Sequence, residues 1–344
     1  MARELRVVHC GLGPIGQGVI RRVLETPGLR VAGATDIAPE LLGRDLGEVL
    51  GLPRKLRIKV EPELRRMVRK ARADVAILST SSSVSAVREP LETLIQARLP
   101  VVSTCEELAF PAPRNRTLFR RLDLLARKKK VSVLSTGVNP GFVMDSLALV
   151  HTAPCARVER VAVTRVVDAA TRRLALQRKV GAGLTLSQFR HAQTEGAVGH
   201  VGLRESVHMI AAGLGWSLDR IEETLEPAVA PRDLDTEYIR VPAGAVAGIK
   251  QYARAYRNGD IAISLDLQMY VGAEAPRDHV VITGEPPVDM TIKGGVAGDL
   301  ATAAIVVNCI PKVMAAAPGL LTMRDLPLLH HLNPLELKDL TRRR

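Results

Sequence analysis

The sequence has few aromatic residues and few cysteines. Phe, Trp and Tyr make up 3% of its 344 residues, so it has little of the stacking surface that nucleic-acid binding proteins offer to bases. Its four cysteines lie far apart and form no C-x-x-C pair. This spacing is typical of neither a zinc site nor a disulfide framework. We therefore expect reduced thiols and no bound metal.

Long apolar runs are also absent. No stretch approaches the roughly 18 consecutive apolar residues of a membrane helix. Residues 1–4 lead directly into a short apolar segment, without the layout of a signal peptide. We therefore expect a cytoplasmic protein without a membrane partner.

Positive charge is in excess, with a formal net charge of +12. Such an excess can serve nucleic-acid binding. Here the basic residues are scattered, and one of the two clusters, at 127–130, ends an expected helix, where cations stabilise the negative end of the helix dipole. We expect no nucleic-acid partner, although an anionic ligand would still be attracted.

The first 145 residues alternate short apolar runs with amphipathic stretches. Buried parallel strands are continuous apolar runs, and parallel neighbours need crossover helices. The pattern predicts an α/β fold with a Rossmann-type doubly wound parallel sheet. Its expected strands are Leu5–Cys10, Arg30–Thr35, Asp74–Ser79, Val101–Ser103 and Val131–Ser135.

The pattern changes after about residue 145 and predicts a second, α+β domain with a largely antiparallel or mixed sheet. A strand is expected at Arg157–Val167, followed by two helices near Leu184–Gln193 and Leu203–Gly213. Long antiparallel strands are expected within Val246–Gly272, because Asn258-Gly259 is a strong hairpin-turn signal. The domains expected are residues 1–145 for the dinucleotide and 146–298 for substrate and dimerisation. An apolar helix, Asp299–Ala317, indicates that residues 299–344 pack back on the first domain.

A glycine-rich motif follows the first expected strand and begins a helix. It comprises Gly11, Gly13, Pro14, Ile15 and Gly16. Glycine permits a tight turn and close backbone approach, and the N–H groups at a helix start accept a pyrophosphate.

An acidic residue lies at the position where dinucleotide sites bind the adenosine ribose. Asp36 ends the next expected strand, twenty residues after Gly16. A carboxylate there binds the adenosine ribose hydroxyls and repels a 2′-phosphate, which favours NAD. NADP stays possible, because Arg44 lies downstream and can flank such a phosphate.

Polar residues follow the next two expected strands, at the edge where open α/β sheets bind ligands. Thr80 and Ser81 are either cofactor contacts or part of a helix start. Thr104 and Cys105 are assigned to the cofactor edge. Glu106 and Glu107 follow them. A glutamate beside a nicotinamide is partly desolvated by the ligand, so its pKa would be raised and it would transfer protons near neutral pH. The alternative is that the two glutamates form an acidic helix start.

A further turn follows the strand at Val131–Ser135. Asn139, within Asn139-Pro140-Gly141, is placed to hydrogen-bond a carboxamide or a substrate. The alternative is that these three residues only form the turn.

Four motifs together resemble the 2,4-diaminopentanoate dehydrogenase family and its native amine dehydrogenase relatives over nearly the whole chain. They are residues 104–108 (TCEEL), 137–142 (GVNPGF), 177–183 (QRKVGAG) and 294–299 (GGVAGD). Such proteins are often labelled dihydrodipicolinate reductase-like. This chain lacks the His-His and Lys-x-x-x-x-Ser-Gly-Thr pattern of a true reductase, so we reject that activity.

The resemblance implies NAD(P)-dependent oxidative deamination of a small primary amine, or of a 2,4-diamino acid, and the reverse reductive amination with ammonia. The family's catalytic glutamate matches Glu106 best. Chemically, a carboxylate there activates water and holds ammonium. Which of Glu106 and Glu107 points inward stays open at this stage.

In the second domain the sequence offers less specific candidates. Arg165 is a candidate partner for a substrate carboxylate, with an exposed structural arginine as the alternative. His200 and His208 are candidates for the pocket, although a histidine near a helix start is more often structural. Arg178 and Lys179 belong to the QRKVGAG motif without an assigned role, and Thr302 is a candidate at the start of the last long helix.

Two other functions stay open. An alcohol or semialdehyde oxidoreductase on the same fold would reduce carbonyls without ammonia, and a non-catalytic dinucleotide-binding protein would turn over nothing. We expect the protein to be a homodimer, from the resemblance and from an exposed sheet in the second domain.

Overall fold

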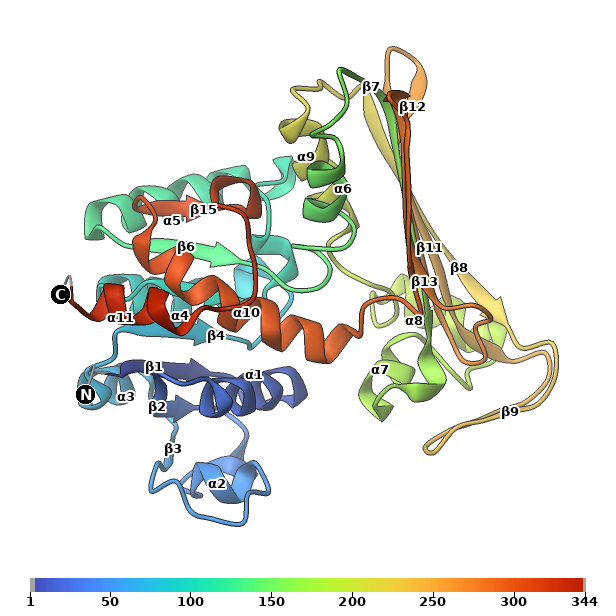
Figure 1. Cartoon of the computed structure of the whole chain (residues 1–344). Helices are drawn as coiled ribbons and strands as arrows, with labels where there is room; N and C mark the ends of the chain where they lie inside the picture. Colours follow the sequence, from blue (N-terminus) through green and yellow to red (C-terminus); the bar gives the residue numbers. More distant parts are fainter. Residues whose placement is uncertain (1–3, 343–344) are drawn as a thin grey trace. The chain divides into compact units, whose positions relative to one another are not determined.

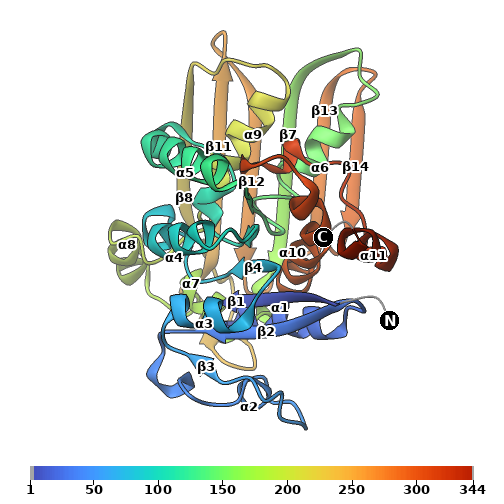
Figure 2. The ribbon, with the colours of Figure 1, turned by 90° about the vertical axis from the view of Figure 1, so that its left-hand side faces the viewer.

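The computed structural model describes residues 4–342, which divide into two compact units. Unit 1 extends to Phe142 and resumes at Ala297, and unit 2 comprises Val143–Val296. The chain therefore enters unit 2 once and leaves it once. Figures 1 and 2 show the ribbon from two directions.

Unit 1 contains a seven-stranded sheet in which all neighbouring strands are parallel. The order is β15-β6-β5-β4-β1-β2-β3 (Figure 1). Its central strands are almost entirely buried, and β4 is a continuous apolar run, as expected for a sheet covered on both faces. The strands are β1 (Leu5–Cys10), β2 (Leu29–Thr35), β3 (Val60–Glu61), β4 (Val75–Leu78), β5 (Val101–Ser103), β6 (Ser132–Ser135) and β15 (Gly319–Leu321).

Helices connect these parallel strands, and one more, α11, follows the last strand. They are α1 (Pro14–Glu25), α2 (Leu46–Val49), α3 (Leu64–Ala71), α4 (Val84–Gln96), α5 (Arg116–Lys129), α10 (Gly298–Ala315) and α11 (Pro334–Arg342). By length and composition alone, α10 could cross a membrane. It packs against α1, β5 and β6, which explains why it is apolar nearly all round.

The order of the strands predicts where unit 1 binds a ligand. The chain winds outward from β1 to β3, then returns to place β4 on the other side of β1. In open α/β sheets such a reversal is the usual ligand position, so a ligand crevice is expected at the carboxyl ends of β1 and β4.

Unit 2 contains a mixed six-stranded sheet of order β14-β13-β7-β12-β11-β8. β7 pairs in parallel with β12, and the other neighbours are antiparallel. The strands are β7 (Arg157–Asp168), β8 (Arg220–Val229), β11 (Val246–Arg257), β12 (Asp260–Tyr270), β13 (Arg277–Glu285) and β14 (Val288–Lys293), with a separate short pair, β9 (Leu234–Asp235) and β10 (Arg240–Val241).

Helices lie on one face of this sheet (Figure 1). α9 packs on β11 and β12, and α6 packs on β13. In the described part of unit 2, no helix covers the opposite face (Figure 2). The helices are α6 (Ser146–His151), α7 (Leu174–Lys179), α8 (Leu186–Thr194) and α9 (Leu203–Gly213).

The predicted fold class is confirmed, and so is the hairpin. Arg257 pairs with Asp260 across a two-residue loop in which Asn258 and Gly259 have φ of 54° and 86°. Positive φ at both positions is the type I′ geometry that Asn-Gly favours. β3, β8, β13, β14 and β15 were not predicted as separate strands.

Candidate active site

The glycine-rich turn connects β1 to α1. Gly11 has φ of 94°, and an added Cβ would lie 2.3 Å from the Ser79 carbonyl oxygen. At Gly16 an added Cβ would lie 2.0 Å from the Gly11 carbonyl oxygen. Both glycines are therefore required by the fold itself, because any side chain would separate β1 from β4 or α1 from the turn.

Gly13 differs from these two glycines. It precedes the first residue of α1, Pro14, and an added Cβ would meet nothing within 4 Å. Gly13 and Pro14 are exposed and Ile15 is half-buried. No packing inside the protein requires a glycine here, which fits close approach of a phosphate to the helix N-terminus.

Asp36 lies at the end of β2 and holds the same turn. Its Oδ2 accepts a hydrogen bond from the Leu12 N–H at 2.5 Å. Its Oδ1 accepts from the N–H groups of Ile37 and Ala38, at 2.7 and 2.9 Å. The half-buried carboxylate thus connects the glycine-rich turn to the position expected for the adenosine ribose. The exposed Arg44 follows nearby in the chain and donates to the Glu40 carbonyl oxygen at 3.5 Å.

Sequence reasoning missed His9, which lies beneath the turn. Its side chain is 1% exposed, and burial lowers its pKa to about 4. Its Nε2 would lie 2.9 Å from a Cβ at Gly16. At neutral pH the imidazole is therefore uncharged and fills the space between β1 and α1. A histidine inside an apolar strand was the signal that could have revealed it.

The carboxyl end of β4 carries Ser79, Thr80 and Ser81. The Ser79 Oγ is buried and has no hydrogen-bond partner among the described residues. Thr80 is exposed, and the Ser81 Oγ accepts from the Ser83 N–H at 3.2 Å. Ser81 therefore supports the turn into α4, whereas Thr80 lies beside the glycine-rich turn, with its Cγ2 2.9 Å from a Cβ at Gly11.

The two glutamates after β5 have different surroundings. The Glu107 Oε2 accepts from the Val84 N–H, at the first residue of α4, at 2.9 Å, and its Oε1 lies 3.4 Å from Arg114 Nη2. Glu107 thus caps α4. Glu106 is half-buried at the start of a 3₁₀ turn, Glu106–Leu108, directly beyond the strand end. The role of Glu107 in this cap argues against a catalytic role for it, so Glu106, which the family motif matches best, remains the candidate for the reactive carboxylate.

Thr104 and Cys105 lie between β5 and these glutamates. Cys105 is 1% exposed, its Sγ donates to the Ser82 carbonyl oxygen at 3.2 Å, and burial raises its pKa. Its side chain is therefore part of the packing between β5 and α4 and is not presented to a ligand. Thr104 is half-buried at the open edge.

The turn after β6 carries two buried polar side chains, and a third contacts the turn from α10. Both amide atoms of Asn139 and the Thr136 Oγ1 are buried and lack hydrogen-bond partners within residues 4–342. Thr302, on α10, accepts from the Val138 N–H at 3.1 Å, so it holds this turn in place. Buried polar groups are nearly always hydrogen-bonded, so those of Asn139 and Thr136 are suited to a polar ligand.

These features together fit a nicotinamide dinucleotide. An open glycine at a helix N-terminus fits the pyrophosphate, a carboxylate after β2 fits the ribose, and unpartnered buried polar atoms beyond β4 and β6 fit the carboxamide and its ribose. The neighbouring strand β5 ends in Glu106.

In unit 2, the surroundings of Arg165 do not support the predicted role of binding a substrate carboxylate. It is 3% exposed, and its Nη1 donates to both carboxylate oxygens of Asp278 at 2.7 Å. Its Nη2 donates to the Val296 carbonyl oxygen at 2.7 Å, and the Val296 N–H donates to Asp278 at 2.7 Å. The guanidinium is thus neutralised inside the protein and fixes the segment that leaves unit 2.

The two histidine candidates are also in unit 2. The backbone of His200 is held by Gln251, which accepts from its N–H and donates to its carbonyl oxygen, both at 2.9 Å. Burial, and then Lys179 and Arg165, lower the pKa of His200 to about 3. His208 is half-buried on α9. Neither lies in unit 1 with the glycine-rich turn.

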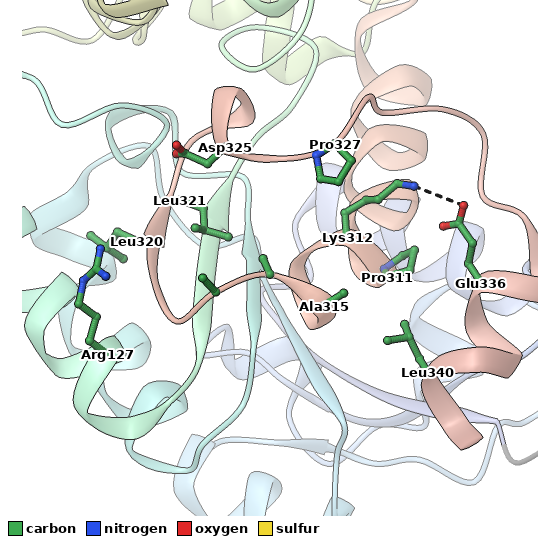
Figure 3. A pocket seen from close by; sticks show the side chains of 12 residues that line it. Arg127, Pro311, Lys312, Ala315, Leu320, Leu321, Asp325, Pro327, Glu336 and Leu340 are labelled. Atoms are coloured by element: carbon green, nitrogen blue, oxygen red, sulfur yellow. Dashed lines mark hydrogen bonds and ion pairs between the residues drawn. The ribbon is translucent and has the colours of Figure 1, made fainter. Parts of the chain in front are cut away.

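A cavity of about 530 Å³ lies elsewhere in unit 1, along β15 (Figure 3). Its wall includes Lys312, whose Nζ lies 3.3 Å from Glu336 Oε1 on α11. None of its lining residues belongs to the glycine-rich turn or to the ends of β4, β5 and β6. We therefore do not assign the cavity to the dinucleotide.

The fold and the site define a nicotinamide-dependent oxidoreductase. Family models agree with this class. Residues 142–341 match the 2,4-diaminopentanoate dehydrogenase C-terminal domain, and residues 5–105 match the dihydrodipicolinate reductase N-terminus. The chain belongs to the 2,4-diaminopentanoate dehydrogenase family, and it is an NAD(P)-dependent oxidoreductase that acts on amines.

Individual relatives extend over nearly the whole chain. A 2,4-diaminopentanoate dehydrogenase of Acetoanaerobium sticklandii is 32% identical over 94% of both chains. An amine dehydrogenase of Streptomyces virginiae is 22% identical and covers 94% of this chain and 96% of its own. The solved amine dehydrogenase of Mycobacterium smegmatis shares the fold, with a TM-score of 0.85 at 23% identity over 95% of this chain and 97% of its own.

Proposed function

We propose that the protein oxidises a small primary amine, including a 2,4-diamino acid, to the carbonyl compound and ammonium, and catalyses the reverse reductive amination. When bound, the nicotinamide takes up or returns the hydride. Overall, a protonated amine, NAD(P)⁺ and water give a carbonyl compound, ammonium, NAD(P)H and a proton.

Glu106 is the proposed catalytic residue. In the oxidative direction its carboxylate accepts a proton from the water that attacks the iminium carbon, and it stabilises the positive charge of the iminium and of the leaving ammonium. The observation that carries this assignment is the engagement of Glu107 with the α4 N-terminus, which commits the other carboxylate at this strand end to a structural role.

The cofactor contacts proposed are those at the crevice. Gly11, Gly13, Pro14, Ile15 and Gly16 form the pyrophosphate turn, Asp36 serves the adenosine ribose, and the ends of the next strands serve the nicotinamide half. Thr80, Thr104 and Asn139 supply the polar side chains there. Ser81, Cys105 and Thr302 position the backbone through the contacts described above.

The test of the catalytic assignment compares Glu106→Gln with Glu107→Gln in ammonium-dependent oxidation of NADH and NADPH by small ketones. We expect Glu106→Gln to lower kcat by about 100-fold or more, the usual size of a general acid–base contribution, with unchanged cofactor affinity. Glu107→Gln should retain kcat within about threefold. Equal losses in both variants would contradict the assignment.

We also propose a preference for NAD over NADP, carried by Asp36. Asp36→Asn keeps an oxygen for the Leu12 N–H but removes the negative charge. The ratio of kcat/KM for NADPH to that for NADH should rise by about tenfold, because the repulsion of a 2′-phosphate is lost. An unchanged ratio would contradict a role for Asp36 in cofactor choice.

Unit 1 is proposed to bind the dinucleotide and unit 2 to contribute substrate recognition and dimerisation in a cytoplasmic homodimer. The face of the unit 2 sheet opposite its helices supports the dimer. It carries half-buried Tyr252, Asp266 and Thr164 in one cross-strand row, with Tyr270 nearby. A large sheet face of this kind is suited to a second copy of the chain.

A further inference from the structure

A basic segment of unit 2 contains the motif that the proposed function leaves without a role. Residues 169–194 include five Lys and Arg residues and no Asp or Glu. The QRKVGAG motif, residues 177–183, lies at its centre, where α7 ends. The inference drawn from it rests on the proposed function and concerns the chemistry of the substrate.

Buried hydrogen bonds fix the shape of this segment. Gln177 is fully buried, and its Nε2 donates to the carbonyl oxygens of Ala170 and Arg172 at 3.3 and 2.8 Å. Its Oε1 accepts from the Thr236 Oγ1 at 2.9 Å. The first residue of the motif is therefore structural, and it holds α7 so that the position of Lys179 at the helix end is defined.

Lys179 lies next to the loop that carries His200. Its carbonyl oxygen accepts from the Gly199 N–H at 3.3 Å, and Gln251 fixes the backbone of His200 from the other side. The His200 Nδ1 is shielded from solvent and has no hydrogen-bond partner in the part of the chain that the structure describes. Lys179 is also one of the two cations that oppose protonation of this ring.

Two acidic side chains of this region are already paired. Asp278 forms its ion pair with Arg165, and Glu223 accepts from Arg204 Nε at 3.0 Å as well as from Gln251. Lys179 itself makes no ion pair among the described residues. The region therefore combines the exposed Lys179, which has no ion pair in the described part of the chain, with a shielded ring nitrogen that has no hydrogen-bond partner there, and an anionic ligand would pair with both.

We propose that Lys179 and His200 form an anion subsite in unit 2 that recognises the carboxylate of an amino-acid substrate. The Lys179 ammonium supplies charge and the His200 Nδ1–H donates one hydrogen bond, as the neutral tautomer allows. The protein thereby selects amino ketones that carry a carboxylate over simple ketones of equal length. Arg165 acts only as a positioning residue, through the Asp278 pair beside this subsite.

The experiment compares two substrates that differ only in the carboxylate, 2-amino-4-oxopentanoate and 4-aminobutan-2-one, in ammonium-dependent NAD(P)H oxidation. The variants are Lys179→Gln, Lys179→Arg and, as a matched control on the same basic segment, the exposed Arg190→Gln. Lys179→Gln should lower kcat/KM for the carboxylate substrate by about 10- to 100-fold, the worth of one charge-assisted hydrogen bond. This loss should lie mainly in KM.

The same variant should leave kcat/KM for 4-aminobutan-2-one within about twofold of the wild type. Lys179→Arg should restore most of the kcat/KM lost with the carboxylate substrate, and Arg190→Gln should change kcat/KM for neither substrate. Equal effects of Lys179→Gln on both substrates, or no effect on either, would overturn the inference while leaving the proposed function intact.

A binding measurement distinguishes failure of the proposed function from failure of the anion subsite. If the wild-type protein turns over no ketone, the proposed function fails, and calorimetric titration with 2,4-diaminobutanoate in the presence of NAD⁺ still tests the subsite. Weaker binding to Lys179→Gln than to Arg190→Gln supports it. Equal binding to both variants, or none to the wild type, contradicts it.

Discussion

Single side chains decide which of the predicted site residues can reach a ligand. The spacing placed Glu106 and Glu107 side by side without distinguishing them, and only the family resemblance favoured Glu106. The distinction comes from Val84, 23 positions earlier in the chain, whose N–H is capped by Glu107. The structural role of Arg165 was likewise not predictable from nearby residues, because its ion-pair partner Asp278 is 113 positions away. Contacts at such sequence separations cannot be derived from local spacing.

Glu107 should matter for stability and not for catalysis. Glu107→Ala leaves the N-terminus of α4 without its cap, so the free energy of unfolding should fall by about 1 kcal/mol. kcat should stay within about twofold of the wild type. Urea unfolding and steady-state rates measured on the same preparation check both statements, and a loss of kcat comparable to that of Glu106→Gln would contradict them.

His9 should make the stability depend on pH. Burial lowers its pKa from 6.5 to about 4, so between these values the unfolded chain binds a proton that the folded protein does not. Its contribution is unfavourable to folding as the pH falls from 6.5 and reaches about 3 kcal/mol near pH 4.

The check is urea unfolding at pH 7 and pH 4.5 for the wild type and two variants. The loss of stability on acidification should be smaller in His9→Leu by about 2 to 3 kcal/mol. The control His191→Gln, which alters a mostly exposed histidine, should behave as the wild type. An identical pH dependence in all three would show that His9 is not buried as described.

Among the secondary-structure elements, those with strong local signals were predicted well. The helix at Leu203–Gly213 was predicted with the bounds observed, because its apolar residues recur at helical spacing. β3 was missed because its two residues carry no periodicity. The parallel pairing of β7 with β12 joins segments about 100 residues apart, and no local pattern encodes it.

The start of α1 offers the sharpest test at the level of one element. Gly13→Ala meets no atom of the protein, so the melting temperature should not fall. If a pyrophosphate approaches this backbone, the added methyl group should weaken NADH binding by about tenfold, which corresponds to about 1.4 kcal/mol.

Gly18→Ala is the matched control, because an added Cβ there also meets nothing within 4 Å but lies inside α1. It should leave the dissociation constant for NADH, measured by fluorescence titration, unchanged. Equal effects of the two substitutions would show that the turn does not bind the cofactor.

The whole molecule combines a dinucleotide-binding unit with a second unit whose sheet has one face without helices. Fold class and the position of the cofactor turn followed from the sequence, since both depend on local patterns. The outer row of side chains in unit 2 did not, because Thr164 joins Tyr252 and Asp266 only when β7 aligns with the β11–β12 hairpin, about 100 residues further along the chain.

The proposed homodimer predicts a solution mass near twice the chain mass of 37.2 kDa in light scattering. Tyr252→Lys should shift the protein toward the monomer, since it places a charge in the centre of the proposed interface. The exposed Arg190→Gln, on α8, should leave the mass unchanged. A wild-type protein that is monomeric at micromolar concentration would contradict the dimer.

The central claim is that the enzyme transfers a hydride between a nicotinamide and an amine-bearing carbon. The most direct test incubates the protein with NADH, a small ketone panel that includes 2-amino-4-oxopentanoate, and ¹⁵N-labelled ammonium, and identifies the product by mass spectrometry. The account predicts one labelled primary amine formed for each NADH consumed, and no consumption without ammonium. An alcohol product, or NADH oxidation that does not require ammonium, would contradict it.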